Sequence, residues 1–207
     1  ETVAQAKKLN NIAKKNNCIL QIGHLEQFNP AIRKIRKSNC KPQFIEVHRL
    51  CQFNPRANDV DVVLDLMIHD IDIVLSLIDK PIKNIEVSGK KILTKLTDIA
   101  NVRIKFEDNI VANLTASRIS TKNERKMRIF SDSSYYSIDF INNELKQVVK
   151  DKKNNFKIKD FSFKKTDVLY EEINNFIKTC LGKEKSMTTG YSGEEALIVA
   201  KKITRNF

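Results

Sequence analysis

The sequence has only four cysteines in 207 residues, and no two of them form a CxxC pair. Such spacing indicates neither a zinc site nor a disulfide framework, so we expect no metal centre and the reduced thiols of a cytoplasmic protein. The chain also lacks a signal peptide and any apolar run of membrane-spanning length that is free of charges. We therefore expect no membrane partner.

Positive charge is abundant, with a formal net charge of +12, but it is spread along the chain. The densest basic stretch, residues 146–165, has few aromatic residues for base stacking and no recognisable nucleic-acid motif. Lysine on the wet faces of strands, where it protects sheet edges, explains the pattern better. We expect no nucleic-acid partner and keep a basic binding module as the least favoured alternative.

The first residues resemble the end of an α/β unit. Residues 1–17 have apolar side chains at helical spacing, and residues 18–25 form a short β-prone run that reaches a glycine. One helix and one strand cannot bury each other, because a parallel strand needs neighbours on both sides. We therefore expect that the rest of this α/β unit lies upstream, and that residues 1–23 are mobile or dock on a neighbouring chain.

Residues 29–207 predict a separate α+β domain. Asn29 is a candidate N-cap for a helix over 30–37, and further helices are expected at 62–78, 167–181 and 192–205, the last with Ser192 and Glu195 at capping-box spacing. Strands are expected at 43–53, 85–93, 99–107, 110–120, 126–133, 135–140, 145–149 and 156–163. Strands this close in sequence must pair mostly antiparallel, which predicts an open sheet with helices on one face.

Four ionisable residues interrupt the apolar run VVLDLMIHDIDIVLSLI at residues 62–78. Asp65, His69 and Asp72 are spaced four and three apart, which places them on one helix face, whereas Asp70 falls off this stripe and is expected to be solvated. Three interpretations remain open: a wet helix face, a metal site and acid–base chemistry. In the last, a carboxylate one turn away would orient an imidazole that removes a proton from a substrate hydroxyl.

Two segments together resemble motifs of the Gfo/Idh/MocA oxidoreductases. GHLEQFNP at residues 23–30 resembles the family's GHxxRFNP element, and DLMIHDID at 65–72 resembles its DxxxHDxD helix. Residues 106–120 resemble the strand pair before the ASR element, and residues 193–203 resemble the last helix. Within the family, the helix and ASRIS look most like the branch that oxidises the 3-hydroxyl of UDP-N-acetylglucosamine.

The resemblance implies a role for each site residue. His69 would be the catalytic base or proton shuttle, and Asp65 would be its orienter or a second polar contact. Cofactor contacts are implied at His24 and Gln27, and contacts with the sugar or diphosphate at Asn29, Arg56, Asp72 and Arg118. For each arginine, a surface ion pair is the alternative.

The resemblance also implies that residues 1–28 are the C-terminal remnant of a Rossmann NAD(P)-binding domain. It further implies a homo-oligomer formed through the open sheet, and a cofactor, NAD or NADP, bound mostly outside this chain. The five glycines form no GxGxxG, and the family's EKP lysine is expected just before Glu1. Gln27 stands where the family usually has arginine. We therefore expect this chain to need a separate Rossmann half for turnover. The alternative is a non-catalytic, oligomerising or sugar-nucleotide-binding remnant of a split gene.

Overall fold

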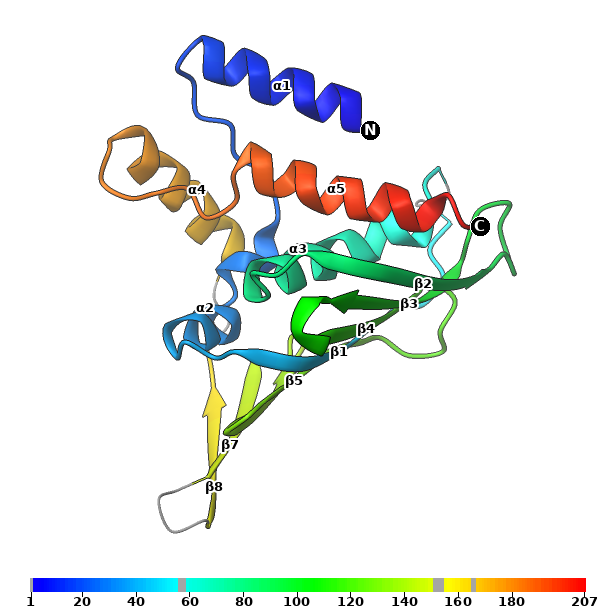
Figure 1. The fold of residues 1–207 in the computed structure, drawn as a ribbon, viewed down its shortest axis with the longest axis vertical. Helices are drawn as coiled ribbons and strands as arrows, with labels where there is room; N and C mark the ends of the chain where they lie inside the picture. Colours follow the sequence, from blue (N-terminus) through cyan, green and yellow to red (C-terminus); the bar gives the residue numbers. More distant parts are fainter. Residues whose placement is uncertain (1, 56–58, 151–154, 165–166) are drawn as a thin grey trace.

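A computed structural model describes the whole chain except residues 1, 56–58, 151–154 and 165–166 (Figure 1). Eight strands form one sheet in the order β2-β3-β4-β1-β5-β6-β7-β8. The strands are β1 Pro42–Leu50, β2 Ile82–Lys90, β3 Ile99–Phe106, β4 Val111–Ser117, β5 Glu124–Ser131, β6 Ser134–Asp139, β7 Glu144–Lys150 and β8 Phe156–Ser162. The α-helices are α1 Val3–Lys15, α2 Pro30–Lys37, α3 Ile68–Leu77, α4 Val168–Cys180 and α5 Gly190–Thr204, and the short turns are η1 Leu25–Phe28, η2 Val63–Met67 and η3 Glu107–Asn109.

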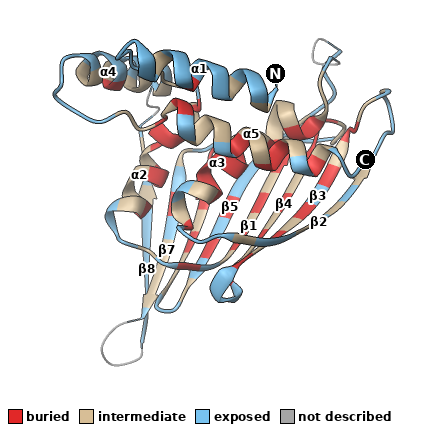
Figure 2. Ribbon diagram, turned by 45° about the horizontal axis from the view of Figure 1, so that its top comes forward, coloured by how far each residue is buried: buried red, intermediate tan, exposed pale blue. Residues whose placement is uncertain are grey.

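The sheet is open and mostly antiparallel, with its helix layer on one face, so the predicted fold class is confirmed. Only β1 and β4 pair in parallel, with Val47 opposite Leu114. On the central strands β3, β4 and β1, alternate residues point toward the helices and are buried, such as Ile45 and Val47 on β1. Figure 2 shows the buried residues concentrated where α3 and α5 cover the central strands. This alternation places the core between the sheet and the helices.

The ends of three neighbouring strands, β4, β1 and β5, lie together at one end of the sheet. Because β4 runs parallel to β1 and β5 runs antiparallel to it, β1 and β4 end where β5 begins. Leu50 faces Ser117 on one side and Glu124 on the other. The turn η2 and the start of α3 pack over this part of the molecule, since η2 contacts β4 and α3 contacts β1.

The N-terminal segment differs from the prediction in two ways. Residues 18–25 form no strand; their only ladder contact among the described residues is a single antiparallel bridge from Gln21 to Thr189. Helix α1 packs on α5 of the same chain, where the Asn10 amide donates to the Gly190 carbonyl at 3.0 Å and to Glu194 at 2.7 Å. A strand needs a paired neighbour along its length, and this segment has a helix end there instead.

Two helix starts also differ in detail. Helix α5 begins two residues before the predicted Ser192, because Thr189 is its N-cap and accepts from the Ser192 amide at 3.1 Å. The predicted helix at 62–78 is divided into a π-turn, η2, and an α-helix, α3. The predicted cap of α2 is confirmed: the Asn29 side chain accepts from the Ala31 amide at 2.9 Å.

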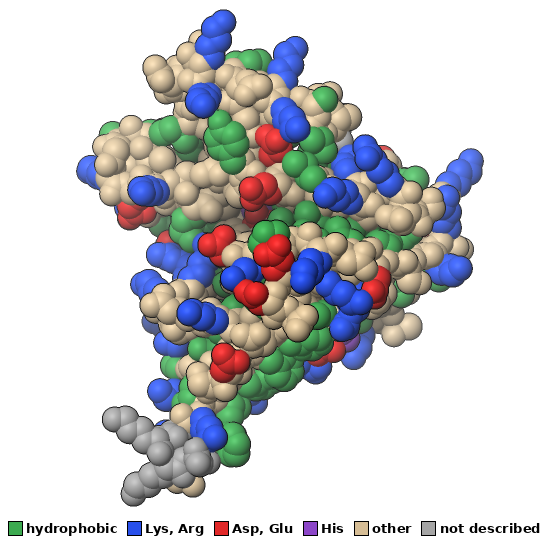
Figure 3. All heavy atoms as spheres, in the orientation of Figure 1, with side chains coloured by type: hydrophobic (Ala, Val, Ile, Leu, Met, Phe, Trp, Pro, Cys, Tyr) green, Lys and Arg blue, Asp and Glu red, His purple; other side chains and the backbone are tan. Residues whose placement is uncertain are grey.

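Charge is dispersed over the surface. On the face that Figure 3 shows, Lys and Arg side chains are scattered among acidic and uncharged ones. In the described part of the chain, no helix is both long enough and apolar enough to cross a bilayer.

Candidate active site

His69 lies in the first turn of α3, near the end of the sheet where β1 and β4 finish. Its ring meets the His24 ring edge to face, with centroids 5.7 Å apart and planes at 73°. The Nδ1 atom of His69 is buried and has no hydrogen-bond partner among the described residues. Burial lowers the pKa of His69, and the positive charge of Arg49 lowers it further. A neutral imidazole with an unused nitrogen can accept a proton from a bound hydroxyl.

Asp65 lies in the π-turn, one turn before His69. Burial raises the pKa of this carboxyl; Arg118 opposes the rise, and Asp59 and Asp61 add to it. Since His69 Nδ1 has no partner, Asp65 does not hold that nitrogen. Asp61 holds the turn itself, because its side chain accepts from the Val63 and Leu64 amides at 2.9 and 3.1 Å. Such π-turns are found mostly at functional sites.

His24 lies in front of a buried polar network. Its Nδ1 is 2.9 Å from Asp72 Oδ1, the Gln27 amide donates to Asp72 Oδ2, and Arg36 donates to the Gln27 carbonyl. Asp72 and Gln27 are 3% and 2% exposed. Asp72 is therefore placed behind His24, where it can fix the orientation and tautomer of that ring. Gln27 links Asp72 to Arg36, a cation from α2.

Asp70 is not solvated, so this prediction was wrong. The residue is 2% exposed, and its two oxygens accept from Arg49 Nε and Nη2 at 2.7 and 2.8 Å. Arg49 also contacts Glu26 Oε1 at 3.3 Å. Burial lowers the pKa of Arg49, but Asp70 and Glu26 outweigh this and hold its pKa above the ordinary range. Arg49 was missed, although the alternation Ile45-Val47-Arg49 on β1 could have shown that it points inward.

The other sequence-predicted residues lie at different distances from this centre. Asn29 is 5% exposed and caps α2, with no part in the His24–His69 contact. Arg118 is 2% exposed; it pairs with Asp98 at 3.0 Å and donates to the Val60 carbonyl at 2.7 Å. Arg56 lies outside the described residues. The structure thus brings together His24, His69 and Asp72, and it places Asp65 one turn before His69. The roles assigned to these residues stay predictions.

The residues around His24 and His69 fit the nicotinamide ring of a cofactor, but they do not fit its pyrophosphate. An edge-to-face pair of imidazoles with an unpartnered nitrogen suits a reacting ring and hydroxyl. The sequence offers no glycine-rich turn for a pyrophosphate. Within the described ranges, no group of three or more His, Cys, Asp or Glu side chains could hold a metal ion.

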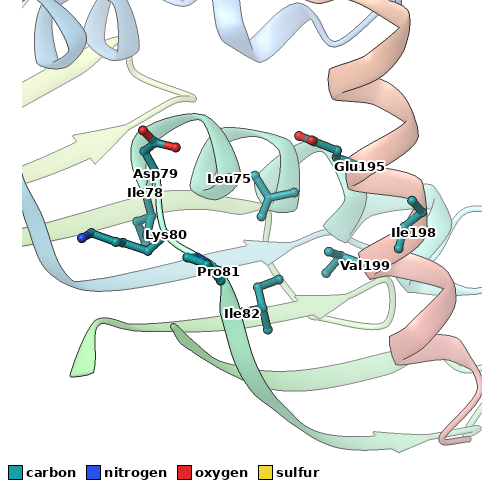
Figure 4. Close-up of a pocket in the computed structure, with 9 residues that line it drawn as sticks. All are labelled: Leu75, Ile78, Asp79, Lys80, Pro81, Ile82, Glu195, Ile198 and Val199. Carbon is teal, nitrogen blue, oxygen red and sulfur yellow. The ribbon is translucent and has the colours of Figure 1, made fainter. Parts of the chain in front are cut away.

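A separate pocket lies at the opposite end of α3 (Figure 4). It is formed by the end of α3, the start of β2 and one face of α5. Its lining residues are Leu75, Ile78, Asp79, Lys80, Pro81, Ile82, Glu195, Ile198 and Val199. Neither His69 nor Asp65 lines this pocket, and most of its lining is aliphatic. The candidate acid–base site is therefore at the other end of the helix.

Comparisons with known proteins show what the chain is similar to. The family model of the GFO/IDH/MocA C-terminal domain matches residues 42–136. UDP-N-acetylglucosamine 3-dehydrogenase of Acidithiobacillus ferrooxidans is 37% identical over 142 residues, which make up 68% of this chain and 45% of that enzyme. The solved structure of UDP-N-acetylglucosamine 3-dehydrogenase from the same organism superposes with a TM-score of 0.92 and 31% identity, covering 99% of this chain and 66% of that one.

Levoglucosan dehydrogenase, solved with NADH and levoglucosan, superposes with a TM-score of 0.86 over 99% of this chain and 68% of its own, at 12% identity, which shows likeness of fold alone. An open mixed sheet under a helix layer is the fold of the C-terminal domain of a class of oxidoreductases. The chain belongs to the Gfo/Idh/MocA family, as residues 23–30 and 65–72 predicted.

Proposed function

We propose that the chain is the substrate-binding half of an NAD(P)-dependent oxidoreductase that oxidises the 3-hydroxyl of UDP-N-acetylglucosamine. The observation that carries the proposal is His69, which has a lowered pKa, a buried nitrogen without a partner among the described residues, and the His24 ring against its own. The 37% identity to a UDP-N-acetylglucosamine 3-dehydrogenase supports this choice of substrate.

The mechanism uses His69 as the base that takes the proton of the sugar hydroxyl. A nicotinamide, when bound, supplies the acceptor for the hydride that leaves the same carbon. Asp65, whose pKa is raised by burial, lies one turn away and adds a second polar contact for the sugar. Asp72 keeps His24 in one orientation from behind. Holding the hydroxyl against a fixed base is the contribution that these residues make.

Apolar surface at the N-terminal side supports a second body that completes the enzyme. On α1 and the following segment, Leu9, Ile12 and Ile19 are 55%, 48% and 41% exposed. Helix α4 likewise exposes Leu169, Tyr170, Ile173, Phe176 and Ile177. Exposed apolar surface on this scale is typical of an interface. We infer that residues 1–28 belong to a dinucleotide-binding domain whose remaining part covers this side and carries most of the NAD or NADP site.

The test is turnover by the product of the complete gene that encodes this chain. UDP-N-acetylglucosamine should reduce NAD or NADP, and His69→Asn should lower kcat by at least about 100-fold, since a positioned base contributes roughly 10²–10⁴-fold. His48→Asn is the control, because His48 lies on the open face of the sheet and is 40% exposed in its side chain. No turnover by the wild-type protein, together with sugar-nucleotide binding by this chain, would favour the non-catalytic remnant.

A further inference from the structure

Three arginines lie side by side at the end of the sheet near His69. Arg118 follows β4 directly, Arg49 is the penultimate residue of β1, and Arg125 is the second residue of β5. Arg49 and Arg125 are opposite each other in the β1–β5 register, so both point to the helix-covered face. Each of the three pairs with a carboxylate from another part of the chain.

Two of these arginines are buried and form ion pairs inside the protein. Arg49 holds Asp70 through two hydrogen bonds and is 3% exposed, and Arg118 holds Asp98 and is 2% exposed. Arg125 differs, because its side chain is 49% exposed and its ion pair is with Glu26 at 3.3 Å. A contact of that length to a half-exposed guanidinium contributes little to stability. Nothing in its packing therefore requires Arg125.

Glu26 does not depend on Arg125 either. The same oxygen, Glu26 Oε1, also lies 3.3 Å from both terminal nitrogens of Arg49. If Arg125 turned away, Glu26 would keep a buried cation as its partner. Arg125 can therefore exchange Glu26 for another anion without leaving a carboxylate unpaired.

Arg125 is connected to the acid–base centre through Glu26 and Arg49. Glu26 Oε1 lies 3.3 Å from both arginines, and Arg49 holds Asp70, the residue that follows His69 on α3. Glu26 is also two residues after His24, whose ring meets the His69 ring. An anion at Arg125 would therefore lie on the side of the molecule where His24 and His69 meet.

We propose that Arg125 binds the diphosphate of a sugar nucleotide whose hydroxyl is oxidised at His69, an inference that rests on the proposed function. The guanidinium fork matches two phosphate oxygens at once, which an ammonium group cannot do. In a nucleotide-linked hexose, the diphosphate on C1 and the hydroxyl on C3 are separated by the sugar ring alone. Arg125 at one end and His69 at the other would fix which hydroxyl is presented to the base.

Calorimetric titration of this chain tests the inference with three probes: UDP-N-acetylglucosamine, N-acetylglucosamine and NAD. Arg125→Ala should weaken UDP-N-acetylglucosamine binding by about tenfold or more, because charge-assisted hydrogen bonds to an anion are lost. Arg125→Lys should recover part of that affinity. N-acetylglucosamine, which has no phosphate, should bind the wild type and Arg125→Ala equally. Arg128→Ala is the matched control, since Arg128 is 47% exposed on the same strand but points to the opposite face of the sheet.

Several results would overturn the inference. Equal weakening by Arg125→Ala and Arg128→Ala would mean that only the overall positive charge attracts the nucleotide. Loss of NAD binding in Arg125→Ala would assign the residue to a cofactor diphosphate instead. No binding of UDP-N-acetylglucosamine to the wild-type chain would also overturn it. The proposed function fails by a different result, lack of turnover by the complete gene product, so the two failures are distinguishable.

Discussion

Asp70 and Arg49 show how one buried pair can hold three elements together. Asp70 is on α3, Arg49 is on β1, and Glu26 on η1 completes the contact at 3.3 Å. Both members of the main pair are almost fully buried. Charges in such a place are tolerated only when hydrogen bonds satisfy them. This pair positions α3, and with it His69, against the end of the sheet.

Replacement of Asp70 by asparagine should destabilise the protein severely. Arg49 would keep its charge but would lose the bidentate carboxylate, and breaking such a buried pair costs roughly 3–5 kcal/mol of unfolding free energy. Urea unfolding followed by circular dichroism measures the change. Asp79→Asn is the control: Asp79 is exposed, two residues beyond α3, and should alter stability by less than about 0.5 kcal/mol. A loss below about 1 kcal/mol for Asp70→Asn would contradict this role.

The titration of His69 gives a second prediction at this scale. Its pKa lies below the ordinary 6.5, first because of burial and then because of Arg49. The unfolded chain therefore binds a proton that the folded chain does not, and the free energy of unfolding falls as the pH drops through 6.5 toward the folded-state pKa. His69→Gln should remove this component of the acid sensitivity.

Nuclear magnetic resonance is the direct check, because the chain has only three histidines. The signal that disappears in His69→Gln identifies His69, and its midpoint should lie below 6.5. A midpoint at or above 6.5 would show that the ring is not desolvated as the structure indicates.

At the scale of elements, the junction of α1 and α5 depends on a glycine. A Cβ atom on Gly190 would overlap the Asn10 side chain and would come within 2.6 Å of Leu20 Cδ2. Asn10 is 4% exposed and is the buried polar link between the two helices. The first residue of α5 is therefore small because α1 crosses it closely.

Gly190→Ala should detach α1 from α5. We expect trypsin to cleave the lysine-rich helix α1 several-fold faster than in the wild type, because local unfolding exposes its backbone. Mass spectrometry of the early products locates the cuts. Gly23→Ala is the control, since the nearest atom to its new Cβ would be Glu172 Oε1 at 3.8 Å, an ordinary contact. Equal cleavage rates in both variants would refute the role of Gly190.

At the scale of the whole molecule, the open face of the sheet is a candidate surface for self-association, as expected for a homo-oligomer. Phe130 lies between Phe44 and Tyr135, whose tilted rings have centroids 5.6 and 4.9 Å away, and it is 38% exposed. Its strand neighbour Ile129 is fully buried on the other face, so the aromatic cluster points away from the helix layer. Aromatic side chains that stay exposed together are typical of interface cores.

Phe130→Asp should convert an oligomer of this chain into monomers, because an unpaired carboxylate would have to be buried in the interface. Sedimentation velocity of the wild type and the variant measures the change. Leu181→Asp, which alters a 63% exposed apolar residue beyond α4, should leave the oligomer intact. A monomeric wild-type chain, or an oligomer that survives Phe130→Asp, would refute the proposed interface.

The sequence by itself determined the sheet and the helix layer, and it gave two acid–base residues, Asp65 and His69, whose roles stay predictions. Alternating strands, caps and helical spacing are local properties, so short segments carry them. The 23–30 and 65–72 motifs likewise predicted the family. The run at 18–25 failed as a strand because pairing depends on a neighbour that its own residues do not specify.

Only the tertiary structure decided which charged side chains are buried in ion pairs and which are exposed and able to bind a ligand. Asp70, Asp72 and Arg118 belong to residue types that are usually found at the surface. They are buried because each pairs with a residue that is distant in sequence. The π-turn that carries Asp65 likewise breaks the even spacing that the residues suggested. Arg125 is half exposed, and it shares its partner, Glu26, with the buried Arg49. Such differences arise from contacts between elements, and no local pattern records them.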